Sequence, residues 1–114
     1  MPRRDWRLFI NDIVESILRI ERYCQEMTYE SFATDERTVD AVVRNITVIG
    51  EATRNIPAEV VARHSEIPWN EMRNMRNVVM HGYFGVSTRI VWETVANDLP
   101  PLVHLLKALL DAEQ

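Results

Sequence analysis

The 114-residue sequence contains little glycine, a single cysteine and no long hydrophobic run. Only three glycines occur, so a turn-rich β fold is disfavoured. With Cys24 alone, no internal disulfide can form, which fits a reducing compartment. No apolar run approaches the roughly 20 residues of a membrane span, and we see no signal peptide. We therefore expect a soluble, cytoplasmic protein without membrane attachment.

Motifs for metals and phosphate loops are missing as well. His64, His81, His104 and Cys24 occur singly, without the paired spacing of zinc ligands. Glycine-rich phosphate loops and the G-x-S-x-G nucleophile turn are absent. We expect no metal and no cofactor, and we assign His64 and His104 to the surface.

The charge of the chain limits how it can bind nucleic acid. A net charge of −4 argues against broad electrostatic attachment, although it is compatible with a local basic cleft. Twelve of the thirteen basic residues are arginines, whose planar fork suits contact with phosphates or carboxylates.

What the sequence does contain is apolar residues at helical spacing. Steps of three and four residues mark amphipathic helices along most of the chain, and no strand pattern competes. The side chains expected to face inward are Trp6, Ile10, Ile13, Ile17, Ile20, Cys24 and Met27, then Val39, Val42, Val43, Ile46 and Ile49, then Trp69, Met72, Met75 and Val79, and finally Val91, Val95, Leu99, Leu102, Leu106 and Leu109.

These patterns predict a single all-α domain over residues 1–114, an antiparallel bundle of four or five helices. Capping residues and prolines place the boundaries. The predicted elements are a helix from Arg4 to Met27, a connection over 28–35 with Thr34 or Asp35 as a cap, a helix to Ile56, a short helix over 57–64, a helix from Trp69 ended by Gly82 and Gly85, and a last helix capped by Ser87 or Thr88 and interrupted at Pro100 and Pro101.

Residues 69–84 concentrate the polar chemistry of the chain. On a regular helix Arg73, Asn77 and His81 lie along one side, whereas Arg76 lies about 140° around from His81. Arg76 and His81 can meet one ligand only if the helix ends near His81 or Arg76 extends well around it. Spacing alone favours a solvated polar face over a site.

The segment Arg76-Asn77-x-x-x-His81-x-Tyr83 resembles the R-x4-H-x-Y signature of HepT-like HEPN proteins. Further segments resemble that family across most of the chain, the first helix being least diagnostic. They are Ile49-Gly50-Glu51-Ala52, Ile67-Pro68-Trp69, Tyr83-Phe84-Gly85, Val91-Trp92 and Asp98-Leu99-Pro100.

The resemblance implies a HEPN-like helical homodimer with the motif helices lining a cleft at its interface. It also implies a metal-independent endoribonuclease, the toxin of a toxin–antitoxin pair. The implied partners are an RNA substrate and a minimal nucleotidyltransferase antitoxin, which silences the toxin by transferring AMP to Tyr83.

The residue types suit cleavage of RNA by its own 2′-hydroxyl. His81 can act as general base or acid, and Arg76 can stabilise the phosphate charge. Asn77 can orient His81 or bind the phosphate. Arg73 is either a contact to a flanking phosphate or a surface arginine.

Two further residues each have alternative roles between which the sequence does not decide. Glu51 either belongs to a solvated, salt-bridged helix face or positions a motif arginine. Tyr83 can stack on a base, accept the modification, or simply pack beside Phe84.

Two other functions remain open. One is a non-catalytic nucleotide-binding or substrate-binding subunit of a nucleotidyltransferase, because phosphate binding and phosphate cleavage use the same residue types. A helical dimerisation module with a vestigial cleft is the third possibility.

Overall fold

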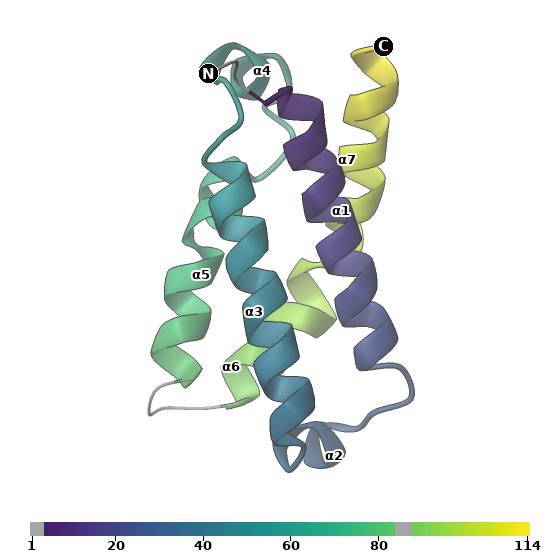
Figure 1. Cartoon of the computed structure of the whole chain (residues 1–114), viewed down its shortest axis with the longest axis vertical. Coiled ribbons are helices and arrows are strands. Elements are labelled where there is room, and N and C mark those ends of the chain that lie inside the picture. Colours follow the sequence, from purple (N-terminus) through teal and green to yellow (C-terminus); the bar gives the residue numbers. More distant parts are fainter. Residues whose placement is uncertain (1–3, 84–87) are drawn as a thin grey trace.

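The computed structural model of the chain describes residues 4–83 and 88–114 (Figure 1). Within these residues it contains α-helices, one π-helical segment and no strand. The elements are α1 (Trp6–Tyr23), α2 (Tyr29–Ala33), α3 (Glu36–Thr53), α4 (Ala58–Arg63), α5 (Trp69–Tyr83), α6 (Thr88–Glu93), the π-helical segment η1 (Thr94–Asp98) and α7 (Pro100–Ala112).

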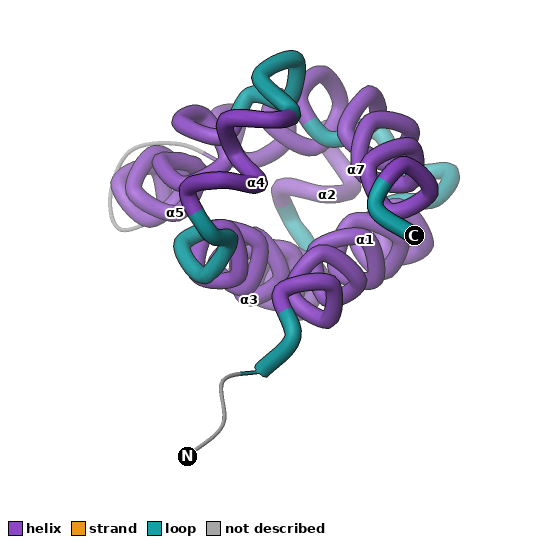
Figure 2. Tube along the Cα trace, turned by 90° about the horizontal axis from the view of Figure 1, so that it is seen from above, coloured by secondary structure: helices purple, strands orange, loops and turns teal. Residues whose placement is uncertain are grey.

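Four long helices form the body of the molecule, which measures 42 × 26 × 25 Å. Figure 1 shows α1 and α5 descending and α3 and α7 ascending along the long axis, so the long helices are antiparallel. Seen along that axis, the helices surround a common interior (Figure 2). The all-α prediction is confirmed. Among the described residues, α1, α3, α4 and α5 correspond to predicted helices, the predicted last helix is divided into α6, η1 and α7, and α2 is additional.

The core is built from the apolar stripes that the sequence predicts. Most inward-facing residues of all four stripes are buried, and Ile10, Ile46, Met72 and Leu106 are completely so. Trp6, Cys24 and Met27, at the ends of the first stripe, are only partly buried. Each fully buried aliphatic side chain stabilises the fold by about 1.5–3 kcal/mol, so these stripes hold the bundle together.

Several element boundaries differ from the prediction. Helix α1 ends at Tyr23 rather than Met27, because the chain turns there and Glu26 adopts a positive φ of 64°. The expected connection over 28–35 contains α2, which starts with a reciprocal cap between Thr28 and Ser31. Helix α5 ends at Tyr83, between Gly82 and Gly85, the two glycines that were expected to end it. Gly85 and Ser87, the other expected turn and cap residues, lie outside the described residues.

The predicted interruption at Pro100 and Pro101 is confirmed. Neither proline has a backbone N–H, so an α-helix cannot run through them without losing hydrogen bonds. The chain forms η1 just before them, where the Leu99 N–H donates to the Thr94 carbonyl oxygen at 3.3 Å. Helix α7 then begins with both prolines in its first turn, where their missing N–H groups cost nothing.

Along the described part of the chain, every helix is too short or too polar to cross a membrane.

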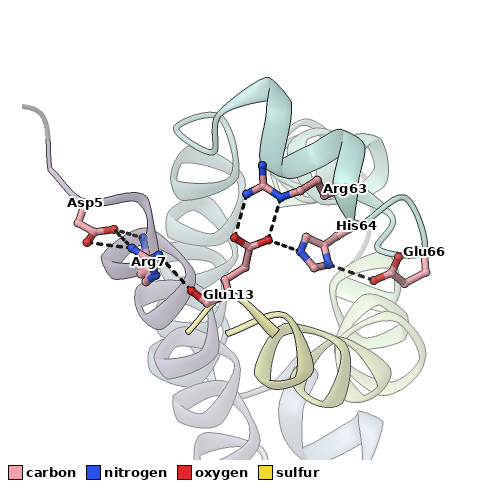
Figure 3. A network of polar contacts seen from close by, with 6 residues as sticks. All are labelled: Asp5, Arg7, Arg63, His64, Glu66 and Glu113. Atoms are coloured by element: carbon pink, nitrogen blue, oxygen red, sulfur yellow. Dashed lines mark hydrogen bonds and ion pairs between the residues drawn. The ribbon is translucent and has the colours of Figure 1, made fainter. Parts of the chain in front are cut away.

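A polar network joins three elements at one end of the bundle (Figure 3). The Glu113 carboxylate accepts hydrogen bonds from Arg63 at 2.8 and 3.0 Å and contacts His64 Nε2 at 2.7 Å. Arg7 donates to the Glu113 carbonyl oxygen at 3.1 Å. The expectation that His64 is a surface residue is wrong, because its side chain is only 13% exposed between Glu113 and Glu66.

The same contacts set the charge state of Glu113. Hydrogen bonds from Arg63 and then His64 lower the pKa of this carboxyl from 4.5 to about 2. A folded-state pKa below the unfolded one adds stability that is complete above pH 4.5 and is lost as the pH falls toward 2.

We therefore predict that Glu113→Gln lowers the melting temperature at pH 7 and that the difference from wild type shrinks between pH 4.5 and pH 2. Thermal unfolding followed by circular dichroism at a series of pH values measures this. Glu21→Gln is the matched control, because Glu21 is exposed and forms no hydrogen bond or ion pair within the described residues. A Glu113→Gln difference that stays constant over that pH range contradicts the assignment.

Candidate functional site

Helix α5 divides its side chains between the core and solvent. Trp69, Met72, Met75 and Val79 are buried, which confirms them as core residues. Asn70, Asn74 and Asn77 are exposed, and Arg73 and Arg76 are half-buried. The helix therefore carries two guanidinium groups and three amides along its outer side.

Arg76 lies on the side of α5 that faces α3. Its Nη1 is 3.6 Å from Oε1 of Glu51, and the two side chains are 43% and 53% exposed. An ion pair this exposed contributes less than about 1 kcal/mol to stability. The pair therefore orients the Arg76 guanidinium more than it stabilises the fold. Its Nε is buried and has no hydrogen-bond partner within the described residues.

Gly50 allows α3 and α5 to come this close. A Cβ atom at position 50 would lie 3.2 Å from the Cβ of Arg76 and 3.4 Å from the carbonyl oxygen of Arg73. Any side chain there would press against the α5 backbone. Glycine at this position thus sets the spacing at which Glu51, the next residue, reaches Arg76.

Amide side chains hold the other polar residues of α5. Arg73 Nη1 donates to Asn70 Oδ1 at 3.0 Å, and Asn77 Nδ2 donates to Asn74 Oδ1 at 3.3 Å. Each of these bonds joins residues one helical turn apart, so they leave Arg73 and Asn77 on the outer side of the helix. Arg73 and Arg76 have different partners, Asn70 and Glu51 respectively.

The backbone of His81 and Tyr83 lies in the last turn of α5. Their side chains lie outside the described part of the structure. Because the helix continues past His81, regular geometry places its Cα about 140° around α5 from that of Arg76. Helix α5 ends two residues after His81, at Tyr83, which agrees with the expected helix end near His81.

The contributions of Gly50 and of two asparagines to this site were not predicted from the sequence. Gly50 appeared there only as part of a family-like segment, and its close approach to Arg76 requires the register of α3 against α5. Asn70 and Asn74 gave no signal beyond their helical spacing from Arg73 and Asn77. Within the described residues, no cluster of three His, Cys, Asp or Glu residues is arranged to hold a metal ion.

The fold and this helix define a class of small all-α proteins with an arginine–histidine motif on one exposed helix. Residues 13–109 match the family model described as "Ribonuclease HepT-like". The chain belongs to the HepT-like ribonuclease family.

Several relatives align over most of their length. "Probable ribonuclease HepT" of Thermococcus cleftensis is 43% identical over 100 residues, covering 88% of this chain and 91% of that protein. "Putative RNase MJ0127" of Methanocaldococcus jannaschii is 37% identical, with coverages of 88% and 83%. "Putative RNase TTE0752" of Caldanaerobacter subterraneus is 34% identical, with coverages of 95% and 96%. No solved structure matches the chain.

The close contact at Gly50 leads to a stability prediction. Valine has a somewhat better helix propensity than glycine, so any loss of stability in Gly50→Val comes from packing against α5. We expect a loss of about 1–3 kcal/mol from overpacking, measured by urea unfolding. Arg44→Val places a valine at an exposed position of the same helix α3 and is the control for a valine that does not press against α5. Unchanged or increased stability of Gly50→Val would show that the two helices can separate freely.

Proposed function

We propose that this protein is a metal-independent endoribonuclease with Arg76 and His81 at its centre, and that it is the toxin of a toxin–antitoxin pair. The observation that carries this proposal is the family match over residues 13–109, which includes Arg76, Asn77, His81 and Tyr83. Relatives with a ribonuclease name align over the same region.

The reaction needs proton transfer and charge stabilisation, and the motif supplies both. A general base takes the proton of the 2′-hydroxyl, whose oxygen attacks the adjacent phosphorus. The bond to the 5′-oxygen then breaks, and a general acid protonates that oxygen. His81 is the acid–base group, since histidine titrates near neutrality. Arg76 stabilises the negative charge on the phosphate oxygens.

The surroundings of Arg76 support this role. Its Nη1 pairs with Glu51, so the guanidinium is already oriented before a substrate binds. Its buried Nε lacks a partner in the described residues, and such a donor is costly unless another oxygen satisfies it. The Arg76 side chain is 43% exposed, and a phosphate oxygen binds at this accessible part of the guanidinium. Asn77 orients His81 or contacts the phosphate, and Arg73 holds a flanking phosphate.

A homodimer would complete the site. One chain offers one histidine near the motif, whereas acid and base act on opposite sides of the reaction. A two-fold axis beside α5 brings the second His81 close, so the two histidines share the roles. Sedimentation equilibrium tests the dimer directly, and a monomeric protein that cleaves RNA would reject this arrangement.

The proposed regulation acts through Tyr83. A nucleotidyltransferase antitoxin transfers AMP from ATP to the Tyr83 hydroxyl oxygen and releases pyrophosphate. The new phosphate adds negative charge on the motif helix. It blocks RNA by repulsion and by occupying space.

The second candidate function is the non-catalytic subunit, which holds a nucleotide or substrate for a nucleotidyltransferase partner. The same oriented Arg76 supports it, because a guanidinium binds a phosphate whether or not the phosphate reacts.

The substitutions Arg76→Ala and His81→Ala are predicted to abolish RNA cleavage in excess chelator. Loss of a general acid–base group or of charge stabilisation typically costs about 10²- to 10⁴-fold in rate, so each variant should lose at least about a hundredfold. Cleavage of single-stranded RNA is followed on denaturing gels with purified protein.

Arg19→Ala is the matched control for Arg76→Ala, because Arg19 is exposed on α1 and forms no hydrogen bond or ion pair within the described residues. It should cleave at the wild-type rate. If wild type, freed of any Tyr83 modification, binds RNA without cleaving it, the non-catalytic function replaces the nuclease.

Tyr83→Phe should remain an active nuclease and resist silencing. Incubation with ATP and the cognate nucleotidyltransferase should add one AMP to wild type and none to Tyr83→Phe, read by intact-protein mass spectrometry. Tyr23→Phe is the control, since Tyr23 is also a helical tyrosine and is 41% exposed. Equal AMP incorporation into Tyr83→Phe and wild type would place the modification elsewhere.

A further inference from the structure

A groove runs along α5 on the flank away from α3. It has a volume of about 410 Å³ and lies between α5 on one side and η1 with the start of α7 on the other. Its apolar lining includes Met72, Met75, Leu102 and Leu105. Val78 also lines it and is 42% exposed, which is unusual for an aliphatic side chain on this helix. A mainly apolar hollow of this size is typical of a small-molecule binding site.

The polar residues of the groove are acceptor-rich. Glu71 and Asn74 come from α5, and Asn97 and Asp98 come from η1. All four are exposed, and none of them is basic. The two carboxylates repel phosphate and attract groups with N–H donors. A nucleotide can therefore place its neutral base here and not its phosphate.

The groove ends next to the proposed catalytic histidine. On a regular helix the Cα of His81 lies about 20° around from that of Asn74 and about 60° from that of Val78. Asn74 also accepts the hydrogen bond of Asn77, the motif residue one turn before His81. The groove and the His81 backbone thus share one strip of α5, whereas Arg76 lies on the flank that faces α3.

We propose that this groove binds the base of a nucleotide beside the cleaved phosphate and prefers bases with an exocyclic amino group. The inference rests on the proposed ribonuclease function. Bases of single-stranded RNA are bound by their apolar faces and by hydrogen bonds to their Watson–Crick edges. The thioethers of Met72 and Met75 suit the aromatic face, and carboxylates accept from the cytosine amino group.

A comparison of cytosine with uracil distinguishes a base-binding site in this groove from general affinity for RNA. They have nearly the same shape, but cytosine presents an amino group where uracil presents a carbonyl oxygen. That oxygen would face Glu71 and Asp98, so uracil is disfavoured. A good pair of such contacts gives an affinity for cytosine about tenfold higher than that for uracil.

The test titrates the pentanucleotides r(C)5 and r(U)5 into the inactive His81→Ala protein. Methyl NMR follows the groove residues, and fluorescence anisotropy gives the affinity. We expect r(C)5 to shift the methyl signals of Met75, Val78 and Leu105 and to bind about tenfold more tightly than r(U)5. Cleavage by the wild-type protein is measured in parallel on both RNAs.

Val78→Glu places a charge in the groove without emptying the core, and Leu8→Glu is its control, because Leu8 is 45% exposed on α1. Val78→Glu should weaken r(C)5 binding about tenfold and remove the preference over r(U)5. Asp98→Asn should reduce the preference for r(C)5 over r(U)5. Leu8→Glu should leave both affinities unchanged.

The outcomes distinguish the two proposals. Cleavage by wild type with unmoved groove methyls, or with equal binding of r(C)5 and r(U)5, overturns the base site and leaves the nuclease intact. The groove would then be open to an apolar protein segment. Groove shifts and a cytosine preference without any cleavage support the base site and reject the nuclease.

Discussion

The contact of α3 with α5 at Gly50 is the constraint on which the candidate site depends. The backbones approach so closely that a Cβ at position 50 would lie 3.2 Å from that of Arg76. This contact fixes both the distance and the register of the two helices. Glu51 meets Arg76 only in that register, since a shift by one residue would turn its carboxylate about 100° around α3. The half-exposed side chains of Glu51 and Arg76 are thus positioned by the buried packing of the α3 and α5 backbones.

The proline pair has the same importance on the other flank of α5. Because Pro100 and Pro101 cannot donate backbone hydrogen bonds, the chain leaves the α-helical path and forms η1. The widened turn carries Asn97 and Asp98 to the edge of the groove, and Pro101 and Leu102 continue its wall. A straight helix through this region would present these residues at different angles. The segment η1 and the prolines that follow it therefore shape one wall of the groove.

The sequence predicts the parts of this structure that follow from periodicity. The buried stripes and the proline break were predicted because apolar spacing and missing donors act locally. Helix α2 was missed because five residues are too few to show a period, and only Phe32 is buried. The Glu51–Arg76 pair remained one of two alternatives, because it depends on packing between helices distant in sequence. His64 was misassigned because its partner Glu113 lies 49 residues away.

The placement of charge on α5 explains how an acidic protein can bind RNA in the proposed way. With a net charge of −4, the surface provides no broad attraction for phosphates. The oriented guanidinium of Arg76 lies on the α3 flank, and the acceptor-rich groove lies on the α7 flank. The His81 backbone lies on the helix surface bordering that groove. An RNA strand crossing α5 must satisfy a phosphate contact on one flank and a base contact on the other. This arrangement favours selection among exposed single strands over tight binding to any RNA.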